Sequence, residues 1–378
     1  MLCVVCRVDE DGLRQESREM EYFDTIKKYD YEQISIIQNQ KAKLFAVDVI
    51  HDTTRGPAVG GTRFMKYPNE EEAIRDALKL SRGMTHKSAV AGLGCGGGKT
   101  VIMEMDGMDR TLVFKTLGRY IDSLKGRRYT GTDLGVSTED IDLMRTETRW
   151  VADETPAGVG DLSEATAFGV YQGIKACLAE AYGDDSLRDR SVSVQGAGEV
   201  GYWVVKYAME NGAKVTITDV NPEAIEKTLK VFPVTVVKPE EIYGVNADVF
   251  SPCAIGGIIC SETIPTLRCR IMAGSANNVL ATEEDGIALF QGGILYAPDY
   301  VINSGALIQW WYRQKTYDIK NRRDPREAIC DLYPVIRNIL KESREKQLPP
   351  AKVADRYAGG QLKKEKTYRE LHWGHGTE

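Results

Sequence analysis

The chain has 378 residues, of which 42% are hydrophobic and 28% are charged, and its formal net charge is -6. This length exceeds the ~250–300 residues at which one hydrophobic core stops growing, so we expect two domains. A net negative charge without a Lys/Arg-rich block argues against a nucleic-acid partner. No apolar run is long enough to cross a bilayer, and the acidic N-terminus does not resemble a secretory signal. We therefore expect a cytoplasmic protein with no membrane partner.

The first 150 residues mix strand-like and helix-like patterns. In chain order, the expected elements are two strands joined by a polar turn (32–50), an amphipathic helix (69–83), a glycine-rich segment (88–100), a strand (100–103) and a helix (110–124). The segment from Ser137 to Asp140 has the form of a capping box, which predicts that a further helix begins there.

A different pattern begins after a loop at 156–163 and a long helix at about 164–182. From 190 to about 305, short apolar strands alternate with helices; the strands are expected at 191–194, 214–218, 248–251, 271–273 and 294–297. This alternation predicts a parallel sheet covered by helices on both faces. We place the domain boundary near 150–155. From about 325 the chain is predicted to be helical and charged, with Gly359 and Gly360 weakening the last helix.

The eight cysteines are scattered, and only Cys3 and Cys6 form a C-x-x-C pair. A zinc site would need a second pair, or histidines at ligand spacing, and the four histidines provide neither nearby. We therefore expect reduced cysteines and no metal site.

A dinucleotide-binding motif follows the strand at 191–194. Gly196, Gly198 and Gly201 have the spacing G-x-G-x-x-G, and a helix over 202–210 follows directly. These glycines permit a tight turn, close approach of a pyrophosphate and close packing of the helix on the strand, while the helix N-terminus attracts phosphates. The next strand ends at Asp219, where a carboxylate would bind ribose hydroxyls and repel a 2′-phosphate. The pattern favours NAD over NADP.

Three residues of the first segment are candidates for chemistry. Lys99 follows three glycines and precedes an apolar strand, and Lys87 could be a nearby cation that lowers its pKa toward neutrality. A single lysine is ordinarily a solvated surface charge, from which the setting of Lys99 distinguishes it, and Asp133 could simply cap a backbone amide in a turn. The run Gly-Gly-Gly-Lys is not a P-loop, because the glycine spacing is one residue too long and no helix follows.

These motifs together resemble the glutamate/leucine/phenylalanine/valine dehydrogenase superfamily, and most closely its leucine and phenylalanine dehydrogenase branch. The similarity runs from about residue 30 to 310. Besides the dinucleotide motif, its landmarks are the segments 56–63, 83–87, 97–99, 130–133, 252–257, 274–278 and 296–303. The resemblance implies an α/β fold, with a Rossmann-type NAD-binding domain (153–335) and an α/β substrate-binding and oligomerisation domain (1–152) separated by a catalytic cleft. The C-terminal helices at 336–378 are expected to complete the substrate-binding domain.

The resemblance also implies roles for individual residues. Lys87 would pair with the substrate α-carboxylate, assisted by Asn278. Lys99 would be the general acid/base for the water that attacks the imino acid, and Asp133 would exchange protons with the amino group and the carbinolamine. The carbonyl of Gly60 would approach the substrate amine, and Gly61 and Met84 complete these substrate contacts. The implied cofactor contacts are Gly196, Ala197, Gly198, Glu199, Val200, Gly201, Asp219, Val220, Cys253, Ala254, Ala276, Asn277 and Asn303.

The pocket for the substrate side chain is implied at Val59, Gly131, Leu307 and Trp310. Leucine-type members of the family carry Ala and Val at the positions of Gly131 and Leu307, whereas phenylalanine-type members tend to carry Gly and Leu, as here. This favours an aromatic substrate, although a methylene's worth of space discriminates by only ~1–3 kcal/mol. Trp310 departs from the family, where a small residue is usual; it either stacks on an aromatic substrate or narrows the pocket.

The sequence thus predicts an enzyme that oxidatively deaminates a hydrophobic L-amino acid, of aromatic type, to its 2-oxo acid and ammonia, with NAD as cofactor. The chain is expected to form a homo-oligomer, a dimer or larger. The alternatives are a branched-chain (leucine or valine) dehydrogenase and a non-catalytic dinucleotide-binding protein. A 2-hydroxy-acid dehydrogenase would need a histidine base, and neither His51 nor His86 lies in a matching motif.

Overall fold

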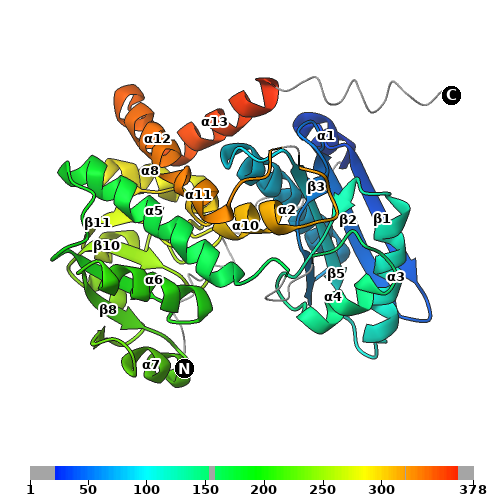
Figure 1. Ribbon diagram of the computed structural model, residues 1–378, viewed down its shortest axis with the longest axis horizontal. Coiled ribbons are helices and arrows are strands. Elements are labelled where there is room, and N and C mark those ends of the chain that lie inside the picture. The colour runs from blue at the N-terminus through cyan, green and yellow to red at the C-terminus, as the bar shows by residue number, and fades with distance from the viewer. Residues whose placement is uncertain (1–21, 153–157, 320, 365–378) are drawn as a thin grey trace. The chain divides into compact units, whose positions relative to one another are not determined.

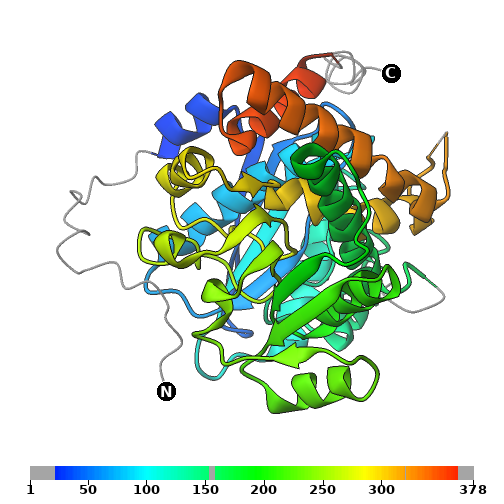
Figure 2. The same cartoon turned by 90° about the vertical axis from the view of Figure 1, so that its left-hand side faces the viewer.

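The computed structural model describes residues 22–152, 158–319 and 321–364, which fold into two compact units (Figures 1 and 2). The described residues up to 160 form the first unit, together with 313–322 and 358–364. The second unit comprises 161–312 and 323–357. The pair Cys3 and Cys6 lies outside the described residues.

Among the described residues, the first unit contains a mixed sheet in the order β1-β2-β5-β3-β6, with β4 also paired to β5. The pairs β1–β2 and β2–β5 are antiparallel, and the others are parallel. The strands are β1 (Gln33–Asn39), β2 (Leu44–Asp52), β3 (Ala58–Val59), β4 (Thr62–Met65), β5 (Gly96–Met103) and β6 (Arg128–Tyr129). The helices are α1 (Tyr22–Tyr29), α2 (Glu70–Val90), α3 (Arg110–Ser123) and α4 (Thr138–Arg145). The expected strand pair at 32–50 and the capping box at Ser137 are confirmed.

Helices cover both faces of this sheet, so its central strands are apolar on both sides. On one face, Val47 and Val101 pack with Leu78 of α2. On the other face, Ile102 packs with Phe114 of α3 and with α4. Adjacent residues of β5 therefore point into different cores, as the alternation of side chains along a strand requires.

Two expected boundaries in the first unit are wrong, and one close contact explains both. Helix α2 continues past Gly83 to Val90, and strand β5 begins at Gly96 rather than at Thr100. A Cβ on Gly97 would lie 2.2 Å from the backbone nitrogen of Thr85, so this glycine lets α2 lie directly on the strand. The glycine-rich segment is therefore buried strand, because tertiary packing outweighs the weak intrinsic strand preference of glycine.

The second unit contains a parallel sheet in the order β12-β11-β10-β7-β8-β9 among the described residues. Its strands are β7 (Ser191–Gln195), β8 (Lys214–Thr218), β9 (Thr235–Val236), β10 (Ala247–Pro252), β11 (Cys269–Met272) and β12 (Leu295–Tyr296). The long helices α5 (Leu162–Tyr182) and α6 (Glu199–Glu210) pack together, and α6 also lies against β7 and β8 (Figure 2). The remaining elements are α7 (Pro222–Leu229), η1 (Ile242–Gly244), η2 (Ile264–Thr266), α8 (Glu283–Gln291), α9 (Asp299–Ile302), α10 (Gly305–Arg313), α11 (Pro325–Cys330), α12 (Leu332–Lys346) and α13 (Pro350–Lys364).

The strand order of the second unit is that of a Rossmann-type dinucleotide-binding fold. If the strands are counted from β7, the order is 3-2-1-4-5-6, and it reverses between β7 and β10. The five strands expected from the sequence are present; only the short, exposed β9 was not predicted. The predicted α/β class, with a Rossmann-type domain, is confirmed.

The division between the units differs in detail from the predicted domain boundaries. The first unit reaches residue 160, and α12 groups with the second unit, whereas 358–364 group with the first. The return of the whole segment 336–378 to the first domain therefore stays a prediction. Within the described part of the chain, no helix has the length and apolarity needed to cross a membrane.

Candidate active site

A buried lysine–carboxylate pair lies at the centre of the first unit. Strand β5 carries Lys99, and the loop after β6 carries Asp133; Nζ of Lys99 lies 3.1 Å from Oδ2 of Asp133. Only 6% of the Lys99 side chain is exposed, against 24% for Asp133. Two residues singled out from the sequence thus meet, with the carboxylate on the more accessible side.

A third group, Arg63 of β4, completes the cluster. Its Nε donates to the same Asp133 oxygen at 2.7 Å, and its Nη1 donates to Oδ2 of Asp76 at 2.9 Å. The hydroxyl of Tyr67 donates to that Asp76 oxygen at 2.6 Å. Because Asp76 and Tyr67 fix the guanidinium, Oδ2 of Asp133 is held between two cations.

Burial and these neighbours set the charge of the pair. Burial lowers the pKa of Lys99, and the positive charges of Arg63 and Arg128 lower it further, while Asp133 opposes them. Burial alone would raise the pKa of Asp133, but the charges of Lys99 and Arg63 hold it below its ordinary value. The carboxylate is therefore ionised at neutral pH, and the lysine loses its proton more readily than a surface lysine. This combination suits proton transfer to and from a bound substrate.

From the sequence, Lys87 was expected beyond the end of a helix at 69–83, and Arg63 was assigned no role. Lys87 belongs to the last turn of α2 and is half-buried, so it does not sit beyond the end of a shorter helix. Arg63 and Arg128 are both cations that act on Lys99. From the sequence, Arg63 was recognised only as the last residue of the segment 56–63. The signal for it was an arginine at the second position of strand β4, two residues after the pair Gly60 and Gly61.

The glycines near the pair leave no room for side chains. A Cβ on Gly60 would lie 1.9 Å from the carbonyl oxygen of Gly98 and 3.2 Å from Cγ of Met84. A Cβ on Gly61 would lie 2.4 Å from the carbonyl oxygen of Thr132 and 3.0 Å from Cβ of Asp133. The predicted residues Gly60, Gly61 and Met84 are therefore brought to the lysine–carboxylate pair. Two further predicted residues, Val59 (buried) and Gly131 (half-buried), lie on the neighbouring segments.

The glycine turn of the second unit has the geometry expected of a phosphate-binding site. Gly196 has a φ of 93°, and a Cβ there would lie 2.9 Å from Ala254. A Cβ on Gly201 would lie 1.9 Å from the carbonyl oxygen of Gly196, so both positions require glycine. Gly198 caps α6 without a side-chain hydrogen bond, and its Cβ position has no heavy atom within 4 Å. An anion can thus approach the first backbone N–H groups of α6.

Asp219 lies beside this turn. Its Oδ2 accepts from the backbone nitrogen of Ala197 at 2.6 Å, and its Oδ1 accepts from that of Asn221 at 2.8 Å. The carboxylate is thereby fixed next to the glycine turn at the carboxyl end of β8. This is the place from which an acidic residue reaches the ribose in this fold.

Two buried acceptors without partners mark the same edge of the sheet. The side-chain nitrogen of Asn303 donates to Oδ1 of Asn277 at 2.7 Å and to the carbonyl oxygen of Ser275 at 3.1 Å. Among the described residues, Oδ1 of Asn303 and Oε1 of Gln195 accept no hydrogen bond although both are buried. Unsatisfied buried acceptors cost free energy, so donors from a bound dinucleotide would suit this edge. Gln195, the last residue of β7, was not predicted.

The other predicted cofactor residues lie in the same unit. They are Glu199 and Val200 in the first turn of α6, the exposed Val220 after β8, Cys253 after β10, and Ala276 in the loop after β11. Leu307 and Trp310 are buried on α10, and Trp310 lies beside Trp311 with ring centroids 6.5 Å apart. Asn278 is exposed, with a φ of 50°. The meeting of Asn278 with Lys87, and of Leu307 and Trp310 with Gly131, stays a prediction because these residues belong to different units.

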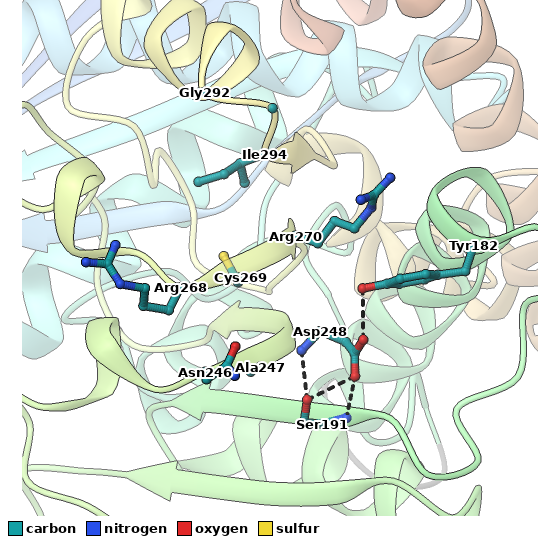
Figure 3. Close-up of a pocket in the computed structure, with 11 residues that line it drawn as sticks. Tyr182, Ser191, Asn246, Ala247, Asp248, Arg268, Cys269, Arg270, Gly292 and Ile294 are labelled. Atoms are coloured by element: carbon teal, nitrogen blue, oxygen red, sulfur yellow. Dashed lines mark hydrogen bonds between the residues drawn. The ribbon is translucent and has the colours of Figure 1, made fainter.

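A polar cavity of about 630 Å³ lies at the opposite edge of the second sheet (Figure 3). Its lining includes Ser191, Asp248 and Cys269, which stand at or near the amino ends of β7, β10 and β11. The carboxylate of Asp248 accepts from the hydroxyl of Tyr182 at 2.8 Å and from the backbone nitrogen and hydroxyl of Ser191 at 2.9 Å (Figure 3). Ligands of such sheets bind at the carboxyl ends of the strands, so this cavity is separate from the dinucleotide site.

The structure also bears on the alternative chemistry. His51 is buried: its Nδ1 lies 2.8 Å from Oγ1 of Thr85, and its Nε2 lies 3.1 Å from the carbonyl oxygen of Tyr29. Burial, followed by the charge of His86, lowers the pKa of His51 to about 4. Both ring nitrogens are occupied, so His51 does not fit the histidine base of a 2-hydroxy-acid dehydrogenase. Across the described residues, no group of three or more His, Cys, Asp or Glu side chains could hold a metal ion.

Comparison with known proteins gives consistent matches over most of the chain. Residues 33–157 match the family model "Glu/Leu/Phe/Val dehydrogenase, dimerisation domain", and residues 158–227 match "Glutamate/Leucine/Phenylalanine/Valine dehydrogenase". The chain is 44% identical to a leucine dehydrogenase of Thermoactinomyces intermedius, over 90% of this chain and 93% of that protein. It is 40% identical to a phenylalanine dehydrogenase of Caldalkalibacillus thermarum, over 90% and 93% of the two chains.

A solved structure gives the same picture. The L-tryptophan dehydrogenase of Nostoc punctiforme superposes with a TM-score of 0.80 and 36% identity, and the match covers 91% of this chain and 99% of that one. The comparisons therefore agree on one family, while the substrates named for its members range from leucine to tryptophan.

Proposed function

Because this chain belongs to the glutamate/leucine/phenylalanine/valine dehydrogenase family and is a dehydrogenase of hydrophobic amino acids, we propose that it catalyses NAD-dependent, reversible oxidative deamination. The substrate is an L-amino acid, and the products are its 2-oxo acid and ammonia. A homo-oligomer in the cytoplasm is the proposed working form.

The observation that carries this proposal is the buried cluster of Lys99, Asp133 and Arg63. A binding module needs no lysine of lowered pKa beside an ionised carboxylate, because maintaining buried charges costs free energy without a return in affinity for a dinucleotide. The cluster therefore favours an enzyme over a non-catalytic dinucleotide-binding protein.

The proposed steps follow from the chemistry of these groups. Asp133, which is ionised, first accepts a proton from the substrate ammonium group. A bound nicotinamide, held at the glycine turn and by Asp219, would supply the acceptor for the hydride that leaves the substrate Cα, and an imino acid would remain. Lys99 removes a proton from the water that attacks the imine carbon, and Asp133 returns its proton to the nitrogen of the resulting carbinolamine. As ammonia leaves, the carbinolamine hydroxyl gives its proton back to Asp133 and the 2-oxo acid forms. Lys87, assisted by Asn278, holds the substrate carboxylate, and the carbonyl of Gly60 accepts from its amine.

Two features support an aromatic substrate within the hydrophobic class. Gly131 and Leu307 are the residues typical of phenylalanine-type members, and the buried indole of Trp310 offers an aromatic surface. A leucine or valine substrate is the second candidate, because the chain is 44% identical to a leucine dehydrogenase. Asp219 supports NAD over NADP, since its carboxylate beside the glycine turn would repel a 2′-phosphate.

The test is a panel of reactions followed by NADH or NADPH absorbance. Phenylalanine, tryptophan, tyrosine, leucine and valine are compared with the corresponding 2-hydroxy acids, each with NAD and with NADP. We expect NAD reduction with the amino acids only, with the highest kcat/KM for an aromatic one. Highest kcat/KM for leucine or valine would replace the aromatic assignment, and reduction with hydroxy acids alone would overturn deamination.

The role of Lys99 is tested by Lys99→Ala, with Lys66→Ala as the matched control because the Lys66 side chain is 71% exposed. We expect kcat for Lys99→Ala to fall by ~10²–10⁴-fold, as for loss of a general acid/base, with NAD affinity unchanged. A Lys99→Ala enzyme as active as Lys66→Ala would overturn the role. If no amino acid is oxidised although NAD binds, the non-catalytic alternative holds.

A further inference from the structure

A second ion pair lies wholly inside the first unit, next to the lysine–carboxylate pair. Nε of Arg128 in β6 lies 3.0 Å from Oδ1 of Asp48 in β2, and neither side chain has any exposed surface. Asp48 also accepts from the hydroxyls of Thr100 at 2.6 Å and Tyr120 at 3.2 Å. The carboxylate is thereby fully engaged and fixes the guanidinium in one orientation.

The guanidinium joins three segments that form the candidate site. Its Nη1 donates to the carbonyl oxygen of Gly60 at 2.8 Å and also to that of Tyr129, and its Nη2 donates to Oγ1 of Thr100 at 3.1 Å. A Cβ on Gly98 would lie 2.8 Å from Nε of Arg128. Gly98 and Thr100, the residues on either side of Lys99 in β5, therefore both lie against Arg128.

Arg128 reaches the strand from the face opposite to the Lys99 side chain. Gly98 and Thr100 share one face of β5, and the side chain between them points to the other face, where α2 packs. The charged groups that act on Lys99 come from three places: Arg63 in β4, Arg128 in β6 and Asp133 in the loop after β6. Of these, Arg128 is held on the far side of the strand, together with its partner Asp48 in β2.

We propose that Arg128 is a positioning residue for the catalytic pair: anchored by Asp48, it fixes the Gly60 carbonyl and the β5 backbone that carries Lys99, and places a permanent positive charge behind that lysine. The proposal rests on the proposed role of Lys99. A guanidinium suits this task because it offers five donors in a rigid fork and keeps its charge at all relevant pH values.

Stability alone gives little reason for such a pair. Replacing a buried ion pair by apolar residues of similar volume is often neutral or stabilising. Removing only one partner destabilises the protein, because the other charge stays buried without compensation. The decisive variant is therefore the double substitution D48L/R128M, which removes both charges at once. A merely structural pair and a positioning pair predict different behaviour for this variant.

We expect D48L/R128M to fold, to bind NAD with unchanged affinity, and to lose at least tenfold in kcat for deamination. The variant removes one charge of each sign, but Arg128 is the member of the pair whose charge lowers the pKa of Lys99. That pKa should therefore rise, and the acid limb of the pH profile of kcat/KM should move to higher pH. Arg128→Lys keeps the charge but not the fork, so we expect its acid limb to stay near the wild-type position while kcat still falls. A folded double variant with wild-type kcat and pH profile would overturn the proposal.

A second readout does not depend on turnover. The pH dependence of Lys99 acetylation by acetic anhydride, followed by mass spectrometry of its peptide, reports the titration of Lys99 directly. We expect the midpoint to rise in D48L/R128M relative to the wild type. An unchanged midpoint overturns the proposal even if deamination is confirmed, whereas a raised midpoint in a protein without amino-acid oxidation refutes only the proposed function. If the double variant does not fold, Arg128→Lys carries the same measurements: wild-type kcat with an unchanged midpoint would overturn the positioning role.

Discussion

The protonation of one lysine depends on side chains from several separate elements. Arg63 and Arg128 lower the pKa of Lys99 beyond the effect of burial, and Asp133 opposes them. Because charges of opposite sign act on the same group, neutralising one at a time should move the pH profile in opposite directions. The direction in which a substitution moves the pH profile therefore shows whether the lost side chain had raised or lowered the pKa of Lys99, which the loss of rate alone does not show.

Asp133→Asn tests this at the scale of a single residue. Removing the carboxylate 3.1 Å from Nζ removes the contact that raises the pKa of Lys99, so that pKa should fall. Deamination needs the lysine without its proton, so the acid limb of kcat/KM should move to lower pH, opposite to the shift expected for D48L/R128M. The loss of proton exchange should also lower kcat by ~10²–10⁴-fold.

The measurement is kcat/KM between pH 6 and pH 11 for Asp133→Asn and for the control Asp106→Asn. The side chain of Asp106 is fully exposed, and its carboxylate lies 3.9 Å from Nζ of the exposed Lys66. The control should reproduce the wild-type profile. If the acid limb of Asp133→Asn stayed in place, a group other than Lys99 would be responsible for it.

At the scale of elements, the packing of α2 on β5 positions the site. Gly97 has no side chain to separate the helix from the strand, so Thr85 of α2 lies against it, and Met84 of the same helix lies close to Gly60. One further glycine, Gly83, lies within α2 on its exposed side, and its Cβ position has no heavy atom within 4 Å. Substitution by alanine should therefore lower the stability of the protein at the crowded Gly97 and raise it at the open Gly83.

We predict that Gly97→Ala destabilises the protein by ~1–3 kcal/mol or more, because its Cβ would lie 2.2 Å from a backbone nitrogen of α2, which cannot move without moving the helix. Gly83→Ala should stabilise the protein by ~0.5–1 kcal/mol, since alanine loses less backbone entropy in a helix. Denaturant unfolding of both variants checks the pair. A Gly97→Ala protein as stable as Gly83→Ala would contradict the close packing of α2 on β5.

At the scale of the whole molecule, the chain divides its functions between two units. The first carries the lysine–carboxylate pair, and the second carries the glycine turn and the orphaned acceptors. The first unit also ends in an edge strand: β1 is first in the sheet order and pairs only with β2 among the described residues. On this strand the side chain of Ile36 is 62% exposed.

We predict that a second copy of the chain covers this strand, because exposed apolar edge strands invite pairing and the matching family model for 33–157 is described as a dimerisation domain. Sedimentation equilibrium should give a mass above the 42.0 kDa of one chain. Ile36→Lys should lower that mass, whereas Val231→Lys, an exposed site on the second unit, should not. A wild-type chain of 42.0 kDa at micromolar concentration would refute the prediction.

Contiguous patterns were predicted well because they form locally. The strand, glycine turn and helix from Ser191 to Glu210 are one continuous segment. Gly196 and Gly201 have no room for a Cβ, and Gly198 leaves open space at the start of the helix. The boundaries of α2 and β5 were predicted wrongly because glycine is a weak former of either element in isolation. Only contact between the two elements makes the segment a buried strand.

The sequence by itself determined the α/β class, the dinucleotide turn with Asp219, and the candidates Lys99 and Asp133, since these depend on short spacings and on residue chemistry. Only the tertiary structure decided that Arg63 and Lys99 contact the same carboxylate oxygen of Asp133. It also decided that Arg128 and Asp48 form a buried ion pair on the opposite face of the strand that carries Lys99. The physical reason is that strand order brings distant residues together, and the pKa of a lysine depends on its burial and on the charges around it.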